Sequence, residues 1–262
     1  MALPRLVFIG SGNLATQLAL TFSEKKYPIL QVYSRTKESA SALAERIGCS
    51  YTTDIALLNT EADIYICALK DSALQEILSK AVFRDKLVVH TAGSIPMDML
   101  SKYSSNYGVF YPLQTLSKNR RVDFSKIPVF IEGNNPENSA ILKSLANSVS
   151  NVVYEATSNQ RKKLHLAAVF ACNFTNHLYA IAANIVKENG DFPMEVLLPL
   201  IDETARKIHT LSPVEAQTGP AVRYDKNVID NHLEMLSSDK NVQQIYDLMS
   251  RHIYKYSTYE EF

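Results

Sequence analysis

The feature that most constrains this chain is a short apolar run that leads directly into a glycine-rich turn. Leu6–Ile9 carries four large apolar residues without polar alternation, which is typical of a strand buried on both faces of a parallel sheet. Gly10 then begins the pattern Gly-x-Gly-x-x-Ala, which ends at Ala15, and Leu14–Phe22 has helical spacing. This strand, turn and helix predict a dinucleotide-binding turn, in which the amides of the helix N-terminus face the pyrophosphate.

The same alternation of strand and helix continues to about residue 155. Further strands are predicted at Leu30–Tyr33, near Tyr51, and at Asp63–Ala68, Leu87–His90, Asn106–Tyr111, Pro128–Ile131 and Val152–Glu155. Helices are predicted between them at Lys37–Ile47, Ala73–Ala81 and Glu137–Val149. Because such crossovers join parallel strands, we expect an α/β fold in which residues 1–155 form a Rossmann-type doubly wound sheet.

The end of the second strand indicates which dinucleotide is bound. Enzymes that select NAD place an Asp or Glu here to hold the ribose 2′-hydroxyl, whereas this chain has Ser34-Arg35-Thr36. A guanidinium and two hydroxyls suit the 2′-phosphate of NADP. The alternative is a surface Arg35 beside a helix cap at Thr36, with NAD as the cofactor.

Ligands of open α/β sheets bind at the carboxyl ends of the strands, and this places the other expected cofactor contacts. The fourth strand is followed by Ala68-Leu69-Lys70-Asp71 and the fifth by Thr91-Ala92-Gly93-Ser94. Lys70 and Ser94 are candidates to contact cofactor or substrate, and Asp71 is equally suited to cap a helix. The predicted cofactor-binding residues are Gly10, Ser11, Gly12, Asn13, Leu14, Ala15, Ser34, Arg35, Thr36, Ala68, Leu69 and Lys70.

Composition excludes several other classes of protein. Lys plus Arg and Asp plus Glu both number 27, so no charge excess indicates nucleic acid. The three cysteines, Cys49, Cys67 and Cys172, are odd in number, far apart and set in apolar sequence, which favours reduced thiols over disulfides or a metal site. We therefore expect no bound metal. The apolar run near the N-terminus is too short for a signal peptide, so we expect a cytoplasmic protein.

Residues 156–262 are expected to form an all-helical second domain that begins with a long helix, Ser158–Lys187. Residues 164–186 include no Asp, Glu, Lys or Arg, which raises the question of a membrane span. At 100° per residue, however, one face gathers His165, Asn173, Asn176 and Asn184, and a lipid-facing helix carries no such amides. We therefore predict that this face borders a polar cleft or a subunit interface, the alternative being satisfied polar groups in a core. Further helices are predicted at Pro193–His209, Asn227–Leu236 and Val242–Tyr256. A capping box at 212–215 predicts the start of another helix.

With these motifs in view, the whole chain resembles a known group of proteins. The motifs are the strand–glycine–helix opening, Tyr111-Pro112-Leu113-Gln114, the stretch His165–His177, and Thr218-Gly219-Pro220. The group comprises Rossmann-like proteins that end in a helical domain of uncharacterised function, related to pyrroline-5-carboxylate reductases and deazaflavin-dependent NADP oxidoreductases. The resemblance implies NADP(H) in the first domain, a homodimer through the C-terminal helices, and a small-molecule substrate in the cleft between the domains.

Two departures from these relatives limit the resemblance. Related β-hydroxyacid dehydrogenases place a catalytic Lys four residues before an Asn, whereas Lys163 and Asn173 are ten positions apart here. The group usually has Arg-Gly-Asp after the Thr-Gly-Pro motif, whereas this chain has Arg223-Tyr224-Asp225. The resemblance therefore implies the cofactor of this protein but does not identify its substrate.

The leading hypothesis is an NADPH-dependent reductase of a small polar carbonyl or imine compound. The resemblance places His165, Asn173, Thr218 and Arg223 beside the cleft, and Gln114 joins them as a substrate contact. His165 is the candidate acid, because an imidazole titrates near neutral pH, while Asn173 orients the substrate and Arg223 pairs with a carboxylate. The alternative hypothesis is a non-catalytic, dimeric NADP(H)-binding sensor or regulatory module, because a fold alone does not establish turnover.

Overall fold

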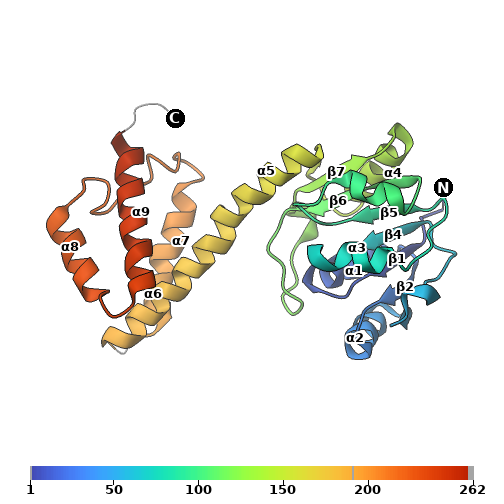
Figure 1. Cartoon of the computed structure of the whole chain (residues 1–262), viewed down its shortest axis with the longest axis horizontal. Coiled ribbons are helices and arrows are strands. Elements are labelled where there is room, and N and C mark those ends of the chain that lie inside the picture. The colour runs from blue at the N-terminus through green and yellow to red at the C-terminus, as the bar shows by residue number, and fades with distance from the viewer. Residues whose placement is uncertain (1, 191, 259–262) are drawn as a thin grey trace. The chain divides into compact units, whose positions relative to one another are not determined.

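The chain divides into two compact units, Met1–Asn173 and Phe174–Phe262, in a computed structural model that describes residues 2–190 and 192–258 (Figure 1). The first unit holds a β-sheet and the second is helical, in agreement with the predicted fold class. The sheet ends at Glu155, where the sequence placed the domain boundary. That boundary remains a prediction, because the long helix that follows the sheet runs from the first unit into the second.

Eight strands form one sheet in the described part of the first unit. Their order is β3-β2-β1-β4-β5-β6-β7-β8, and the first six have the 3-2-1-4-5-6 order of a Rossmann sheet. The strands are β1 (Leu6–Ile9), β2 (Ile29–Tyr33), β3 (Ser50–Thr52), β4 (Ile64–Cys67), β5 (Leu87–His90), β6 (Asn106–Pro112), β7 (Val129–Gly133) and β8 (Val153–Glu155).

The last two strands differ from the uniformly parallel arrangement expected from the sequence. β7 pairs with β6 in the antiparallel sense, with Phe110 opposite Ile131, and β8 runs parallel to β7. The reason lies in residues 113–128, where the only helical element described is the 3₁₀ turn η3 (Phe124–Lys126). Without a crossover helix, the chain turns back and β7 returns beside β6.

Helices cover both faces of the sheet, which explains the apolar run in β1. Leu6 and Phe8 pack into the core beneath α1 (Asn13–Glu24), α2 (Lys37–Ile47) and α4 (Pro136–Asn147). Val7 and Ile9 pack into the opposite core, beneath α3 (Asp71–Leu78) and the 3₁₀ helix η2 (Met97–Lys102). All four side chains have 0% exposure. This arrangement leaves the carboxyl ends of the parallel strands available to position a site.

Two segments that begin with capping residues differ in whether a helix follows. Asn135 caps α4, since its side chain accepts a 2.8 Å hydrogen bond from the Asn138 amide, and Pro136 is the first helical residue. At 212–215 both reciprocal capping-box bonds form between Ser212 and Glu215, but the segment closes only a turn and no helix follows. Gly219 and Pro220 lie just beyond this turn and disfavour helix continuation.

The long helix predicted from Ser158 is present, but it contains an irregularity that the sequence did not indicate. It consists of α5 (Ser158–Ala168), the π-helical segment η4 (Val169–Phe174) and α6 (Thr175–Gly190). The predicted polar residue Asn173 lies within this π-helical segment. By length and composition alone, Ser158–Glu188 would also pass as a membrane span.

The second unit buries few of its apolar side chains. Beyond α6 it contains η5 (Met194–Leu197), α7 (Leu198–Lys207), α8 (Lys226–Met235) and α9 (Lys240–Thr258), so the helix predicted from Pro193 begins with a 3₁₀ turn. Among its described residues only Ile229 and Ser250 are buried. Many large apolar side chains are exposed, among them Phe192, Val196, Leu198, Leu200, Ile208, Met235, Leu248 and Met249.

Candidate functional site

The turn between β1 and α1 has the geometry that a dinucleotide requires. Gly10 has φ +119°, and a Cβ on it would lie 2.2 Å from the carbonyl oxygen of Ala68, so no other residue fits without a shift of the backbone. A Cβ on Gly12 would meet nothing within 4 Å, which leaves its backbone open to close approach. Gly12 is also the N-cap of α1, so no side chain caps the first amides of the helix. These residues therefore fit a pyrophosphate group.

The end of β2 lies beside this turn. The Ser11 hydroxyl donates a 2.8 Å hydrogen bond to the Ser34 hydroxyl, which links the glycine turn to the predicted 2′-phosphate contacts. Arg35 and Thr36 are exposed. Thr36 occupies the N-cap position of α2, but its hydroxyl caps no backbone amide. An exposed Arg35 beside a residue at the N-cap position is compatible with both interpretations, and the binding of a 2′-phosphate by Ser34, Arg35 and Thr36 remains a prediction.

The loops after β4 and β5 bring the other predicted contacts to the same edge of the sheet. Ala68 and Leu69 contact Gly10 directly, since a Cβ on this glycine would lie 2.2 Å from the Ala68 oxygen and 3.4 Å from the Leu69 side chain. Lys70 is exposed and precedes α3. The Ser94 hydroxyl donates a hydrogen bond to the Asp71 carboxylate, so the two loops are joined.

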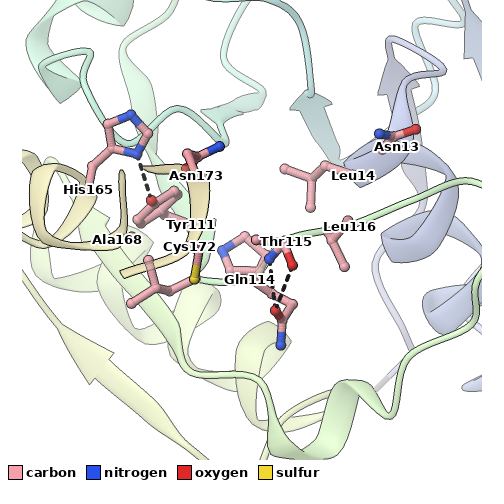
Figure 2. Close-up of a pocket in the computed structure, with 12 residues that line it drawn as sticks. Asn13, Leu14, Tyr111, Gln114, Thr115, Leu116, His165, Ala168, Cys172 and Asn173 are labelled. Atoms are coloured by element: carbon pink, nitrogen blue, oxygen red, sulfur yellow. Dashed lines mark hydrogen bonds between the residues drawn. The ribbon is translucent and has the colours of Figure 1, made fainter. Parts of the chain in front are cut away.

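A cavity of about 440 Å³ opens beside the start of α1, and Figure 2 shows the residues around it. Its wall combines the first residues of α1, the end of β6 with the loop after it, and the part of the long helix that belongs to the first unit. The residues that line it include no Asp, Glu, Lys or Arg. The lining residues are Asn13, Leu14, Tyr111, Pro112, Leu113, Gln114, Thr115, Leu116, His165, Ala168, Cys172 and Asn173.

Three segments meet closely around His165 at this cavity. The Tyr111 hydroxyl lies 3.1 Å from Nδ1 of His165, and burial raises the pKa of the Tyr111 phenol. Gly93 lies against both rings, because a Cβ on it would be 2.7 Å from Cγ of His165 and 2.8 Å from the Tyr111 oxygen. The imidazole can therefore approach the loop after β5 only because residue 93 is a glycine.

The loop that forms one wall of the cavity is fixed to the helix that follows the glycine turn. Gln17 of α1 has 0% exposure, and its side-chain amide donates to the main-chain oxygens of Ser117, Lys118 and Arg120 at 2.7, 3.3 and 3.1 Å. Arg121 donates back to the Gln17 side-chain oxygen at 3.0 Å. These hydrogen bonds therefore tie the loop beside the cavity to the helix that follows the glycine turn.

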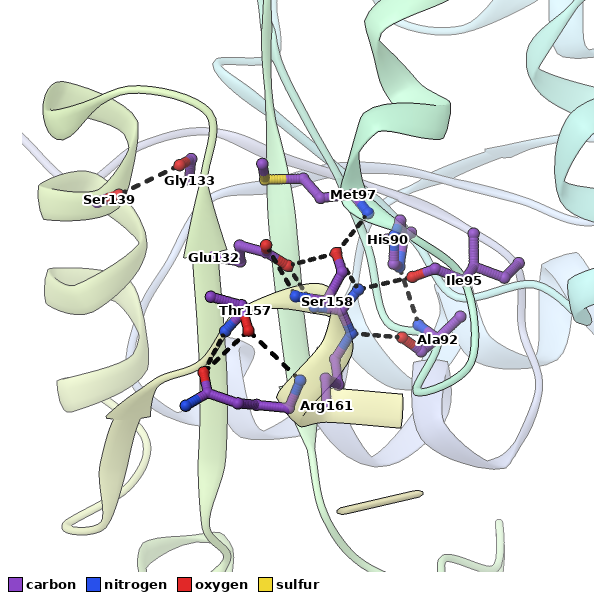
Figure 3. A network of polar contacts seen from close by, with 11 residues as sticks. His90, Ala92, Ile95, Met97, Glu132, Gly133, Ser139, Thr157, Ser158 and Arg161 are labelled. Atoms are coloured by element: carbon purple, nitrogen blue, oxygen red, sulfur yellow. Dashed lines mark hydrogen bonds and ion pairs between the residues drawn. The ribbon is translucent and has the colours of Figure 1, made fainter. Parts of the chain in front are cut away.

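A buried ion pair anchors the start of α5 to the sheet, as Figure 3 shows. Arg161 has 1% exposure and pairs with Glu132 of β7. It also donates to the main-chain oxygens of Ala92 at 3.2 Å and Ile95 at 2.6 Å. Ser158 completes the network, since it donates to Glu132 at 2.8 Å and accepts from the Met97 amide at 2.9 Å. Arg161 thus holds the loop that contains Gly93 in place beside His165, which lies one helical turn further along α5.

A buried histidine lies beneath the same loop. His90 accepts a 3.2 Å hydrogen bond from the Ala92 amide at Nδ1, and its Nε2 is the buried side-chain polar atom without a partner among the described residues. Burial, followed by the charge of Arg161, lowers the pKa of His90 to about 4. His90 is therefore neutral at physiological pH and supplies no charge to the cavity.

The structure brings many of the predicted site residues together. His165, Asn173 and Gln114 line the cavity with Asn13 and Leu14, although the Gln114 side-chain oxygen is turned back onto the Thr115 amide at 2.8 Å. Thr218 and Arg223 are exposed residues of the second unit that precede α8, and their part in the site remains a prediction.

Several residues that hold His165 or the loop beside the cavity were not singled out by the sequence analysis. Tyr111 appeared there only within a motif, and Gly93, Arg161 and Gln17 were not assigned a role. Each acts through a partner distant in sequence, 54 residues away in the case of Tyr111 and His165. No local pattern reveals such a pairing.

Family models match both parts of the chain. Residues 5–93 match the model described as NADP oxidoreductase, coenzyme F420-dependent, and residues 127–253 match a domain of unknown function, DUF2520. A pyrroline-5-carboxylate reductase of Pseudomonas aeruginosa is 26% identical over 110 residues. That match spans 39% of this chain and only 40% of the length of the curated relative.

Solved structures resemble the chain over nearly its whole length. The crystal structure of a candidate NADP oxidoreductase from Bacteroides fragilis is 54% identical, with a TM-score of 0.91 and coverage of 97% of this chain and 98% of that one. A reductive aminase from Aspergillus terreus, solved with NADPH and ethyl-5-oxohexanoate, has a TM-score of 0.74 at 14% identity, covering 97% and 95% of the two chains, which shows a shared fold. The chain belongs to the family of Rossmann-type NADP oxidoreductases that carry this C-terminal domain of unknown function.

Proposed function

We propose that this protein is a cytoplasmic NADP(H)-dependent enzyme that reduces a small polar carbonyl or imine compound. The observation that carries the proposal is the composition of one cavity. Asn13 and Leu14 of the cofactor turn line it together with His165 and Asn173, so a substrate there would lie between the dinucleotide and an acid–base side chain. The nicotinamide supplies the hydride, and the protein orients the substrate and handles a proton.

The residues of the glycine turn and of the β2 end would hold the cofactor. Gly10, Gly12 and the first amides of α1 bind the pyrophosphate, and Ala15, with 0% exposure, is small enough for the helix to pack against the sheet. Ser34, Arg35 and Thr36 bind the 2′-phosphate, with the Ser34 hydroxyl oriented by its bond from Ser11.

Replacing Arg35 with alanine is expected to weaken NADPH binding about 10- to 100-fold and to leave NADH binding unchanged. The reason is that hydrogen bonds to a charged group contribute about 1.5–3 kcal/mol, and NADH lacks the phosphate. Titration of the intrinsic fluorescence of each reduced cofactor measures both affinities. Arg46→Ala, an exposed arginine at the end of α2, is the matched control. Equal losses for both cofactors would remove Arg35 from phosphate recognition.

In the cavity we assign proton donation to the substrate to His165, and orientation of the substrate to Asn173 and Gln114. Reduction adds a hydride to the substrate carbon and a proton to its oxygen or nitrogen, and His165 is the side chain of the wall that is suited to supply this proton. Thr218 and Arg223 remain candidates for further substrate contacts, with Arg223 suited to a carboxylate.

The decisive experiment is NADPH oxidation on a panel of keto acids, cyclic imines and an oxidised deazaflavin. Turnover of a keto acid or a cyclic imine that saturates with its concentration supports the reductase. Turnover of the deazaflavin alone would show that the substrate is a deazaflavin and not a small carbonyl or imine compound. Tight NADPH binding without turnover of any member is the result expected of a non-catalytic NADP(H)-binding sensor.

We also propose that the protein is a homodimer formed through its C-terminal helices. The support is the exposed apolar surface of the second unit, where Leu200, Met235 and Leu248 are 66–70% exposed. Light scattering after gel filtration is expected to give twice the chain mass of 29.3 kDa. Leu248→Asp on α9 is expected to give the monomer, whereas the exposed Lys240→Asp on the same helix is expected to remain dimeric. A monomeric wild-type protein at micromolar concentration would refute this assembly.

A further inference from the structure

The hydroxyl of Tyr111 has a defined hydrogen-bond role at the cavity. The Tyr111 side chain is 8% exposed, and burial raises the pKa of the phenol, so the hydroxyl keeps its hydrogen at neutral pH. A buried O–H group without an acceptor is costly. The acceptor within reach is Nδ1 of His165 at 3.1 Å, and Figure 2 shows this contact at the cavity wall.

This contact determines where the imidazole carries its own hydrogen. A neutral histidine has one ring nitrogen that donates and one that accepts. If the phenol donates to Nδ1, the ring hydrogen must lie on Nε2. Gly93 permits the arrangement, because a Cβ at this position would lie 2.8 Å from both Nδ1 of His165 and the Tyr111 oxygen.

We propose that Tyr111 is a positioning residue that holds His165 in the Nε2–H tautomer, so that the Nε2–H group is the donor offered to the substrate oxygen or nitrogen. The inference rests on the proposed role of His165 in the reduction. A neutral imidazole that donates from Nε2 polarises a carbonyl or imine bond before the hydride arrives. When the Nε2 proton moves to the reduced oxygen or nitrogen, the hydroxyl hydrogen of Tyr111 moves to Nδ1, so the ring stays neutral, and the phenol then regains a proton from solvent. Tyr111 itself acts through His165.

The test measures the tautomer directly in the full-length protein with NADP⁺ bound. Two-bond ¹H–¹⁵N correlation spectra of protein labelled at histidine distinguish protonated from unprotonated ring nitrogens, and the His165→Asn variant assigns the signals. In the wild type we expect Nε2 to be protonated and Nδ1 to be an acceptor. In Tyr111→Phe, which keeps the packing ring, we expect the Nδ1 signal to move toward the protonated position as the second tautomer becomes populated.

Turnover gives a second readout. Loss of one hydrogen bond is expected to lower kcat about 3- to 10-fold in Tyr111→Phe, with KM and NADPH affinity unchanged. Tyr107→Phe removes a hydroxyl from the same strand, away from the cavity lining, and is expected to change neither readout.

The possible results separate the two proposals. A wild-type Nδ1 that is protonated, or a tautomer that is unchanged in Tyr111→Phe, overturns the role of Tyr111. A shifted tautomer together with full activity of His165→Asn supports the role of Tyr111 in fixing the ring and removes His165 from the proposed reaction.

Discussion

Replacing Arg161 with methionine is expected to lower the free energy of unfolding by about 3–5 kcal/mol. Methionine fills a similar volume, so the loss comes mainly from the Glu132 carboxylate, which stays largely buried at 17% exposure without its partner. The main-chain oxygens of Ala92 and Ile95 also lose a donor. Urea unfolding followed by circular dichroism measures the change. Hydrogen exchange of the Met97 amide then reports whether the loop after β5 has loosened.

Two further variants identify the cause of this loss. Lys143→Met removes one member of an exposed ion pair with Glu155, in which the side chains are 56% and 61% exposed, and is expected to cost less than about 1 kcal/mol. Adding Glu132→Gln to Arg161→Met replaces the carboxylate that has lost its arginine partner with a neutral amide. The double variant is expected to recover part of the lost free energy of unfolding. If the free energy of unfolding of Arg161→Met lies within about 1 kcal/mol of the wild-type value, the ion pair does not anchor α5.

His165→Asn is expected to lower turnover about 100- to 10,000-fold, the usual contribution of a general acid. NADPH affinity is expected to stay the same, because His165 lies on α5 and the predicted cofactor contacts lie at the glycine turn and the strand ends. The measurement is NADPH oxidation with the substrate identified by the panel, together with a fluorescence titration of the cofactor.

The control for this variant is His209→Asn, an exposed histidine of the second unit. It is expected to match the wild type in both assays. A His165→Asn protein with wild-type turnover would exclude this side chain as the acid, and a parallel loss of NADPH affinity would indicate a role in binding the cofactor instead.

The sequence predicted the cofactor half of the molecule well because its signals are local. The run Leu6–Ile9 requires burial on both faces, and Gly10 occupies a backbone conformation that favours glycine, so strand, turn and helix follow from adjacent residues. The direction of β7 could not be predicted, since it depends on whether residues 113–128 form a crossover helix. The π turn at Val169–Phe174 likewise has no established sequence pattern.

The candidate site was predicted only in part, because several of its contacts join distant segments. His165 and Asn173 were singled out from the polar face of one helix, and the cavity contains both. Arg161 begins a run of three basic residues, Arg-Lys-Lys, which is typical of an exposed helix surface, yet it is among the most deeply buried side chains. Its burial follows from the position of Glu132, 29 residues earlier on β7, which the local sequence does not show.

The way Gln17 holds the loop after β6 has a consequence for how this protein can vary. Its amide binds three main-chain oxygens of the 117–120 turn and none of the side chains there. Exchanging the side chains of Ser117, Lys118 or Arg120 therefore leaves these bonds intact. The exposed tip can therefore carry a different charge while the bonds that hold the loop beside the cavity stay the same.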